Sequence, residues 1–240
     1  MEAIVANIER IEDEIKQACS NVRRDPSTVR LLAVSKTFPV EAIKTAYEAG
    51  QYLFGENRVQ EICRKIPLLP EQIEWHLIGT LQRNKVKDVI GKIALIHSVD
   101  SLSLAYEINK QALKKNLSVN ILLQVNIAGE EKKHGFTSQG VREKMEELSR
   151  LPGLRIKGLM TIAPFAANPE EVRSVFRQSK DLAEYIEGLG LPGVQMKELS
   201  MGMSSDFRVA VEEGATLVRI GSRIFGTRNY VRGSVVNEGI

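Results

Sequence analysis

The sequence is poor in the residues that nucleic-acid sites and membrane spans depend on. Only 5% of its 240 residues are aromatic, and the net charge of +3 is spread without a long Lys/Arg block. We discount nucleic acid as the main partner, because base stacking needs aromatic rings and phosphate backbones need clustered positive charge. No run of about 18 apolar residues occurs, so we expect no membrane span.

Cysteine and histidine are also scarce. Cys19 and Cys63 are too few and too far apart for a disulfide framework or a cysteine-rich metal site. The three histidines show no paired-ligand spacing such as H-E-x-x-H, so no metal is expected. The acidic, amphipathic start lacks the basic segment and apolar block of a secretory signal. These absences predict a cytoplasmic protein with reduced thiols.

What the chain does have is apolar material for a core and a regular alternation of patterns. It is 43% hydrophobic and 26% charged, as in soluble globular proteins. Eight short apolar runs, each followed by helical spacing or a short tail, recur about every 30 residues, close to one βα unit. We therefore expect one domain spanning residues 1–240. The predicted strands are 30–35, 52–54, 75–78, 94–99, 119–125, 156–161, 197–200 and 217–220.

This alternation fits either a closed barrel or an open, doubly wound sheet. The open sheet is disfavoured because the turn after the first strand, 35–39, contains no glycine. A G-x-G-x-x-G pattern at 188–193 ends a helix and precedes a strand, the reverse of the dinucleotide-binding context. Ile4, Ile8 and Ile11 begin a helical stripe ahead of the first strand. We predict a (β/α)8 TIM barrel with an extra N-terminal helix.

A lysine stands where such a barrel places its functional groups, at the carboxyl end of a strand. Lys36 directly follows the first apolar run. Near a desolvated rim the charged form of an amine is disfavoured, which suits a nucleophile that forms a Schiff base. Position alone leaves open that Lys36 reaches water or pairs with a carboxylate.

The loops after the seventh and eighth strands carry a second signal. Residues 200–205 and 219–226 are small and rich in hydroxyls, and each precedes a helix or its remnant. Backbone N–H groups and hydroxyls there would bind a phosphate, although two ordinary tight turns would look the same. A lysine opposite a phosphate site suggests pyridoxal 5′-phosphate (PLP) or a sugar phosphate. His76 and His97 lie within strands and are expected to be hydrogen-bonded inner-layer residues.

Six motifs stand in order along nearly the whole chain. They are 32–37 (LAVSKT), 54–61 (FGENRVQE), 75–85 (WHLIGTLQRNK), 158–162 (GLMTI), 199–206 (LSMGMSSD) and 218–226 (VRIGSRIFG). Together they resemble the pyridoxal-phosphate homeostasis protein family, also called the proline-synthetase co-transcribed homologues. The resemblance implies a fold-type III PLP-binding barrel similar to the N-terminal domain of alanine racemase.

The resemblance also implies roles for individual residues. Lys36 would hold the PLP aldehyde as an internal aldimine, and Asn57 would lie near the ring. Arg219 would face the pyridine nitrogen. The implied phosphate ligands are Ser200, Ser204, Gly221 and Ser222.

These roles predict a PLP-binding protein without efficient catalysis. An arginine keeps its proton, so Arg219 would disfavour a protonated ring nitrogen and weaken the ring as an electron sink. The stretch 223–240 after the eighth strand is too short for the second domain that completes racemase sites. We therefore predict a monomeric carrier in intracellular PLP homeostasis, which buffers PLP or delivers it to apoenzymes, with amino acids as further possible partners.

Two other functions stay open at this stage. A PLP-dependent amino-acid racemase or lyase with a single-domain site would need an acid–base group, for which Tyr47, Tyr52 and His76 are the candidates. An aldolase-like barrel would use Lys36 to bond a sugar phosphate directly, with no cofactor.

Overall fold

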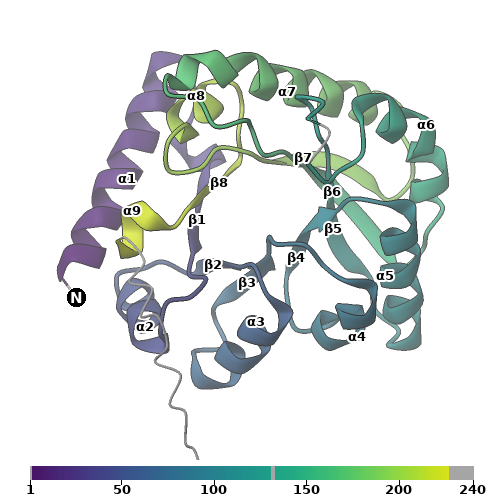
Figure 1. Cartoon of the computed structure of the whole chain (residues 1–240), viewed down its shortest axis with the longest axis horizontal. Helices are drawn as coiled ribbons and strands as arrows, with labels where there is room; N and C mark the ends of the chain where they lie inside the picture. The colour runs from purple at the N-terminus through teal and green to yellow at the C-terminus, as the bar shows by residue number, and fades with distance from the viewer. Residues whose placement is uncertain (1, 131–132, 227–240) are drawn as a thin grey trace, which may run out of the picture.

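Eight parallel strands form a closed barrel in the computed structural model, which describes residues 2–130 and 133–226. The strands hydrogen-bond in chain order, and β8 pairs with β1 to close the ring, with helices around the outside (Figure 1). The predicted (β/α)8 barrel is confirmed. The strands are β1 (Arg30–Val34), β2 (Leu53–Glu56), β3 (Glu74–Leu77), β4 (Leu95–Val99), β5 (Val119–Gln124), β6 (Leu154–Met160), β7 (Val194–Ser200) and β8 (Leu217–Ile220).

Helices follow each strand, and one extra helix precedes the barrel. The predicted N-terminal helix is present, and the expected short tail after β8 begins with one helical turn and is described only to Gly226. The α-helices are α1 (Glu2–Asn21), α2 (Val40–Glu48), α3 (Val59–Lys65), α4 (Val86–Val89), α5 (Leu102–Lys114), α6 (Ser138–Ser149), α7 (Arg173–Glu187), α8 (Phe207–Glu212) and α9 (Ser222–Phe225). Single 3-10 turns are η1 (Pro26–Thr28), η2 (Ile66–Leu68), η3 (Arg83–Lys85) and η4 (Pro169–Val172).

Most strand ends lie within two residues of the prediction, and two elements differ more. The strand expected at 197–200 begins earlier, at Val194. The prediction is too short because the first half of this strand alternates exposed and half-buried residues and does not form one apolar run. The helical spacing expected after the third strand begins as the 3-10 turn η3, and α4 has only four residues. Neither change moves the carboxyl end of a strand, which is where the candidate site residues lie.

The strands divide the core into an outer layer and a barrel interior. On β1, Leu31 and Ala33 pack with the helices, whereas Leu32 and Val34 belong to the interior cluster. The interior cluster also contains Leu53, Leu95, Leu122, Met160 and Leu217.

The same alternation carries polar groups into the barrel interior. His76 stands between Trp75 and Leu77, which pack in the outer layer, so His76 points inward. His76 and His97 are fully buried, and both rings have hydrogen-bond partners. The prediction that they are satisfied inner-layer residues is confirmed.

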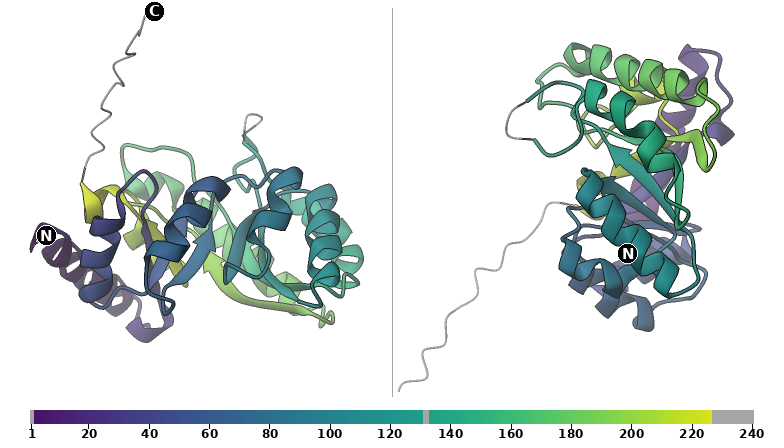
Figure 2. Two further views of the ribbon diagram at one scale, coloured as in Figure 1. Left: turned by 90° about the horizontal axis from the view of Figure 1, so that it is seen from below. Right: turned by 90° about the vertical axis from the view of Figure 1, so that its right-hand side faces the viewer.

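The extra helix α1 lies beside α8 and α9, as Figures 1 and 2 both show. Glu14 on α1 binds two arginines at once. Arg208 Nε on α8 and Arg223 Nη1 on α9 each lie 2.9 Å from Glu14 Oε2. Asn7 Nδ2 also donates to the carbonyl of Ile224, at 3.0 Å. Because α8 follows the β7 loop and α9 follows the β8 loop, α1 ties these two loops together.

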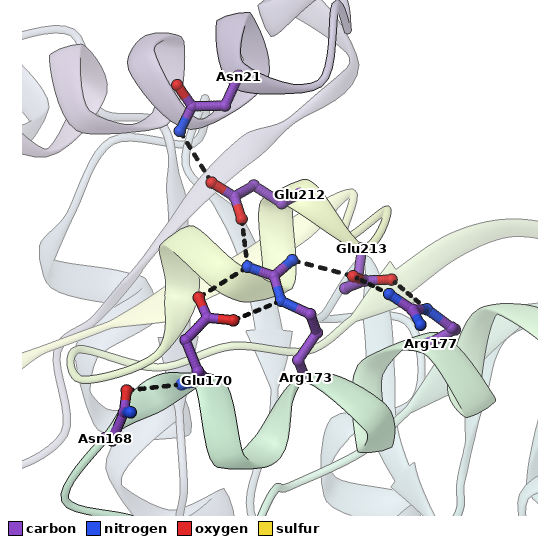
Figure 3. Close-up of polar contacts among 7 residues, drawn as sticks. All are labelled: Asn21, Asn168, Glu170, Arg173, Arg177, Glu212 and Glu213. Carbon is purple, nitrogen blue, oxygen red and sulfur yellow. Dashed lines mark hydrogen bonds and ion pairs between the residues drawn. The ribbon is translucent and has the colours of Figure 1, made fainter.

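A second ionic cluster fixes the other side of α8 (Figure 3). Arg173 on α7 binds Glu170 at 2.7 Å, Glu212 at 2.6 Å and Glu213 at 2.9 Å. Asn21, the last residue of α1, donates to Glu212 at 2.9 Å. The short helix α8 is therefore held between α1 and α7, and the loop that precedes it starts from a fixed base.

Replacing Glu14 tests whether α1 stabilises the two short helices. We expect Glu14→Gln to cost about 1 kcal/mol, because charge-assisted bonds to two partly exposed arginines are weakened. In a chain of this size that lowers the midpoint of thermal unfolding by about 2–4 °C. Glu12→Gln, at an exposed position of the same helix, is the control and should change nothing.

The effect of Glu14 should also depend on pH. The hydrogen bond from Arg223 holds the pKa of Glu14 below its ordinary value. Its stabilisation is therefore present at neutral pH and is lost as the pH falls from about 4.3 through the lowered native pKa. Equal unfolding midpoints for Glu14→Gln and Glu12→Gln at neutral pH would show that the Glu14 bonds contribute nothing.

Candidate cofactor-binding site

The predicted site residues lie at one end of the barrel, where the parallel strands terminate. Lys36 comes two residues after β1, Asn57 directly follows β2, and Gly221 directly follows β8. A Cβ atom added to Gly221 would lie 3.0 Å from the carbonyl oxygen of Val34, so the ends of β8 and β1 are in close contact. The structure therefore brings the lysine and the predicted phosphate loops to the same mouth.

Lys36 sits in a tight turn, residues 35–38, that we call the Lys36 turn. The backbone N–H of Phe38 donates to the carbonyl of Ser35 at 3.1 Å and closes the turn. Thr37 has φ of +69°, a left-handed conformation that a β-branched residue rarely adopts. Its N–H donates to Glu61 Oε1 at 2.6 Å, which holds this conformation. The residue beside Lys36 is thus kept in a strained geometry by a carboxylate from α3.

A buried lysine fixes the Lys36 turn from beneath. Lys65 Nζ lies 2.9 Å from the carbonyl oxygen of Ser35, 2.7 Å from Glu56 Oε1 and 2.8 Å from Glu61 Oε1. Ser35 Oγ also donates to Glu56 Oε1, at 2.7 Å. Burial raises the pKa of Glu56, and the neighbouring Lys65 opposes that rise. We call Lys65, Glu56 and Glu61 the Lys65 clamp.

The sequence analysis did not predict the Lys65 clamp. The spacing of Glu61 and Lys65, four residues apart on a polar helix, is typical of a solvent-exposed ion pair. The structure instead buries Lys65, leaving 7% of it exposed. One residue could have indicated a buried cation nearby. Glu56 is a carboxylate at the end of the second predicted strand, and a carboxylate buried there needs a positively charged partner.

Asn57 presents an acceptor without a partner. Its Oδ1 is buried and accepts no hydrogen bond from the described part of the chain, and the same is true of Glu56 Oε2. A Cβ atom on Gly79 would lie 2.3 Å from the carbonyl oxygen of Asn57, so the end of β3 packs directly on this residue. An unpaired buried acceptor is costly, and a ligand that carries a donor group would satisfy it.

The loops after β7 and β8 meet through their serines. Ser222 Oγ donates to Ser204 Oγ at 3.2 Å. Gly202 has φ of +86°, and a Cβ there would lie 2.6 Å from the Cβ of Ala210, so only glycine fits. The carbonyl of Gly202 accepts from the N–H of Arg219, at 3.0 Å. Two hydroxyls therefore meet at the start of α9, where the first N–H groups of a helix have no partner within it, and such a place suits a phosphate.

A contact between aromatic rings links these loops to the Lys36 turn. The rings of Phe38 and Phe225 lie 5.0 Å apart, centroid to centroid. Phe225 ends α9, which begins at Ser222. A displacement of the loop after β8 would therefore disturb the packing of the Lys36 turn.

Arg219 is buried in the barrel interior close to this mouth. Its Nη1 donates to Ser200 Oγ at 2.7 Å, and its Nη2 donates to the carbonyl of Thr161 at 2.9 Å. Burial lowers the pKa of Arg219 to about 10, so the guanidinium keeps its charge at neutral pH. Ser200 is also bonded to His97, not to the Ser204–Ser222 pair. A role for Ser200 at the phosphate stays a prediction.

The three candidates for an acid–base group, Tyr47, Tyr52 and His76, are not placed beside Lys36 to act on a substrate. Tyr52 precedes β2 and so stands at the opposite end of the barrel from Lys36. Tyr47 packs its ring against Tyr52 at 5.2 Å. His76 is fully buried, with both ring nitrogens hydrogen-bonded. These placements disfavour the racemase or lyase alternative.

Residues 2–130 and 133–226 contain neither a cluster of metal ligands nor a membrane-spanning helix. In those ranges, no group of three His, Cys, Asp or Glu side chains is arranged to hold a metal ion. Over the same described part of the chain, no helix combines the length and apolar character needed to cross a membrane. Cys19 and Cys63 are both free.

Comparison with known proteins agrees with this geometry. The family described as alanine racemase, N-terminal domain, matches residues 6–229. The pyridoxal phosphate homeostasis protein of Aquifex aeolicus is 45% identical over 224 residues, which cover 93% of this chain and 97% of that protein. The Escherichia coli protein of the same name is 39% identical over 234 residues, covering 96% and 99%.

A solved structure extends the comparison to three dimensions. PipY of Synechococcus elongatus, with PLP bound, is 39% identical with a TM-score of 0.78, covering 88% of this chain and all of PipY. Alanine racemase of Clostridium difficile shares the fold, with a TM-score of 0.74 at 16% identity, over 95% of this chain and 57% of the racemase. The chain belongs to the pyridoxal phosphate homeostasis protein family, as its motifs imply.

Proposed function

We propose that the chain binds PLP through Lys36 and serves in PLP homeostasis as a carrier without efficient catalysis. The observation that carries this proposal is the Lys36 turn, held in one geometry by the Lys65 clamp at the same mouth as the joined serine loops. A lysine on a turn of fixed backbone, at the same mouth as the predicted phosphate loops, suits an aldehyde that bears a phosphate. The names of the relatives and the PLP-bound PipY structure support the choice of PLP.

The residues at the mouth fit the parts of PLP. Lys36 would bind the aldehyde carbon, and Arg219 would face the ring nitrogen. The unpaired Oδ1 of Asn57 would accept a hydrogen bond near the ring. When bound, PLP supplies an aldehyde that condenses with amines and a ring that withdraws electrons. The proposed phosphate ligands are Ser204, Gly221 and Ser222, with Ser200 behind them.

Two features support binding without turnover. Arg219 remains charged at neutral pH, so it would keep a neighbouring ring nitrogen unprotonated and limit the electron-withdrawing power of the ring. Tyr52 stands at the far end of the barrel, and His76 is fully occupied within it. A racemase or lyase needs an acid–base partner near Lys36, and these side chains do not fill that role.

Removing the amine of Lys36 tests the proposal. The purified protein mixed with PLP should show the visible absorption band of lysine-bound PLP. Lys36→Ala should lack the band and still unfold at a similar temperature, because the change lies at the rim of the barrel. Lys44→Ala, at an exposed position of α2, should behave like the native protein. A full band in Lys36→Ala would contradict the proposal.

The same preparation tests the absence of efficient catalysis. PLP-loaded protein supplied with amino acids should neither racemise nor decarboxylate them at ordinary enzyme rates. Sustained turnover of about one per second or faster would show that the protein is an enzyme and would contradict the carrier function.

Removing the cation of the Lys65 clamp should weaken PLP binding, although none of the proposed PLP ligands is changed. Lys65→Met leaves Glu56 buried without its cation, which costs about 3–5 kcal/mol of folding stability. It also removes one of the two hydrogen bonds to the carbonyl of Ser35, so we expect PLP affinity to fall about tenfold or more, equivalent to about 1.4 kcal/mol. Arg64→Met, the exposed neighbour on α3, is the matched control. Native affinity in folded Lys65→Met would show that the clamp does not position Lys36.

A further inference from the structure

A chain of hydrogen bonds runs through the barrel interior from Glu74 to Arg219. His76 Nε2 lies 2.9 Å from Glu74 Oε1, and His76 Nδ1 lies 2.8 Å from His97 Nε2. His97 Nδ1 then lies 2.9 Å from Ser200 Oγ, which accepts from Arg219 Nη1 at 2.7 Å. Glu74 begins β3 and Ser200 ends β7, so the chain joins opposite ends of the barrel. We call these five residues the interior relay.

The carboxylate end of the interior relay dictates its direction. A carboxylate only accepts, so a neutral His76 carries its proton on Nε2 and donates it to Glu74. His76 Nδ1 then accepts from His97, which carries its own proton on Nε2. His97 Nδ1 in turn accepts from the hydroxyl of Ser200. The guanidinium of Arg219 only donates, and the Ser200 oxygen accepts from it.

Every donor in this arrangement has an acceptor, and both imidazoles are neutral. The reverse arrangement would turn the lone pair of His76 Nε2 toward the Glu74 carboxylate, which is repulsive. Burial lowers the pKa of His76 and, further, that of His97, which keeps both rings neutral. The hydrogen bond from His76 lowers the pKa of Glu74, which keeps the carboxylate ionised.

The Glu74 end of the interior relay reaches solvent among other charges. The Glu74 side chain is 43% exposed, and its Oε1 lies 3.7 Å from Arg30 Nη1. Arg30 also binds Glu198 at 2.7 Å. An accessible carboxylate at one mouth is therefore connected, through buried groups, to the guanidinium at the other.

We propose that Glu74, His76, His97 and Ser200 are positioning residues for the cofactor site, because their shared proton pattern fixes the orientation of Arg219. The acceptor at position 74 sets the direction of every bond up to Ser200. Where it concerns PLP, this inference rests on the proposed function. The proton pattern itself does not depend on PLP.

A donor at position 74 should reverse the whole interior relay. In Glu74→Lys the ammonium only donates, so His76 Nε2 must accept from it. The proton of His76 then sits on Nδ1, and that of His97 on Nδ1 as well. The oxygen of Ser200 would then be shared between two donors, His97 and Arg219, which would weaken its bond to Arg219 and loosen the guanidinium. Glu74→Gln keeps an acceptor oxygen and is the matched control.

Nuclear magnetic resonance of 15N-labelled histidine reads these positions directly. The chain has only three histidines, and His134, which lies outside the interior relay, serves as the reference ring. In PLP-free native protein and in Glu74→Gln, we expect His76 and His97 to be neutral and protonated on Nε2. In Glu74→Lys, both should be protonated on Nδ1.

Two spectra would overturn the inference. A native protein with either inner ring protonated on Nδ1 has no relay in the proposed direction, and this holds even if Glu74→Lys fails to fold. A folded Glu74→Lys in which His97 keeps its Nε2 proton would show that position 74 does not control the far end.

Release of PLP tests the link to the cofactor. We expect Glu74→Lys to release PLP about tenfold faster than Glu74→Gln, a difference of about 1.4 kcal/mol. Equal release rates would refute the coupling to Arg219. A native protein that takes up no PLP would refute the proposed function instead, while the histidine spectra would still decide the interior relay.

Discussion

The ion pair between Lys65 and Glu56, buried beneath the first strand end, is the interaction on which the site depends. Lys65 holds the carbonyl of Ser35, and Glu61 holds the N–H of Thr37, so both neighbours of Lys36 are fixed. A buried charge is tolerated only with its partner in place, which makes this arrangement all or none. On an unrestrained loop the backbone at Lys36 would adopt many conformations. Here the contacts on both sides hold it in one.

The rest of the barrel extends the same constraint around its mouth. The helix α1 ties α8 to α9 through Glu14, and the rings of Phe38 and Phe225 connect α9 to the Lys36 turn. The interior of the barrel is part apolar and part a column of hydrogen-bonded groups that ends at Arg219. The Lys36 turn, the proposed phosphate loops and Arg219 are thus held by separate sets of contacts that meet at one end of the strands.

The fold, and the positions of the site residues at strand ends, could be predicted from the sequence because both follow from local patterns. Apolar runs at a regular interval are enough to place Lys36, Ser204 and Ser222 at strand ends. The contacts that organise them are long-range: His97 and Ser200 are 103 residues apart, and Glu14 and Arg223 are 209 apart. No local pattern pairs such residues. The burial of Lys65 was equally hidden, because its spacing from Glu61 fits an exposed helix pair.

The central claim is that the amine of Lys36 is the group that binds PLP. Borohydride reduction makes a bond between a lysine and PLP permanent, and peptide mass spectrometry then locates it. Native protein loaded with PLP, reduced and digested should carry the added mass on the peptide that contains Lys36. Added mass on another lysine, or no added mass at all, would contradict the account.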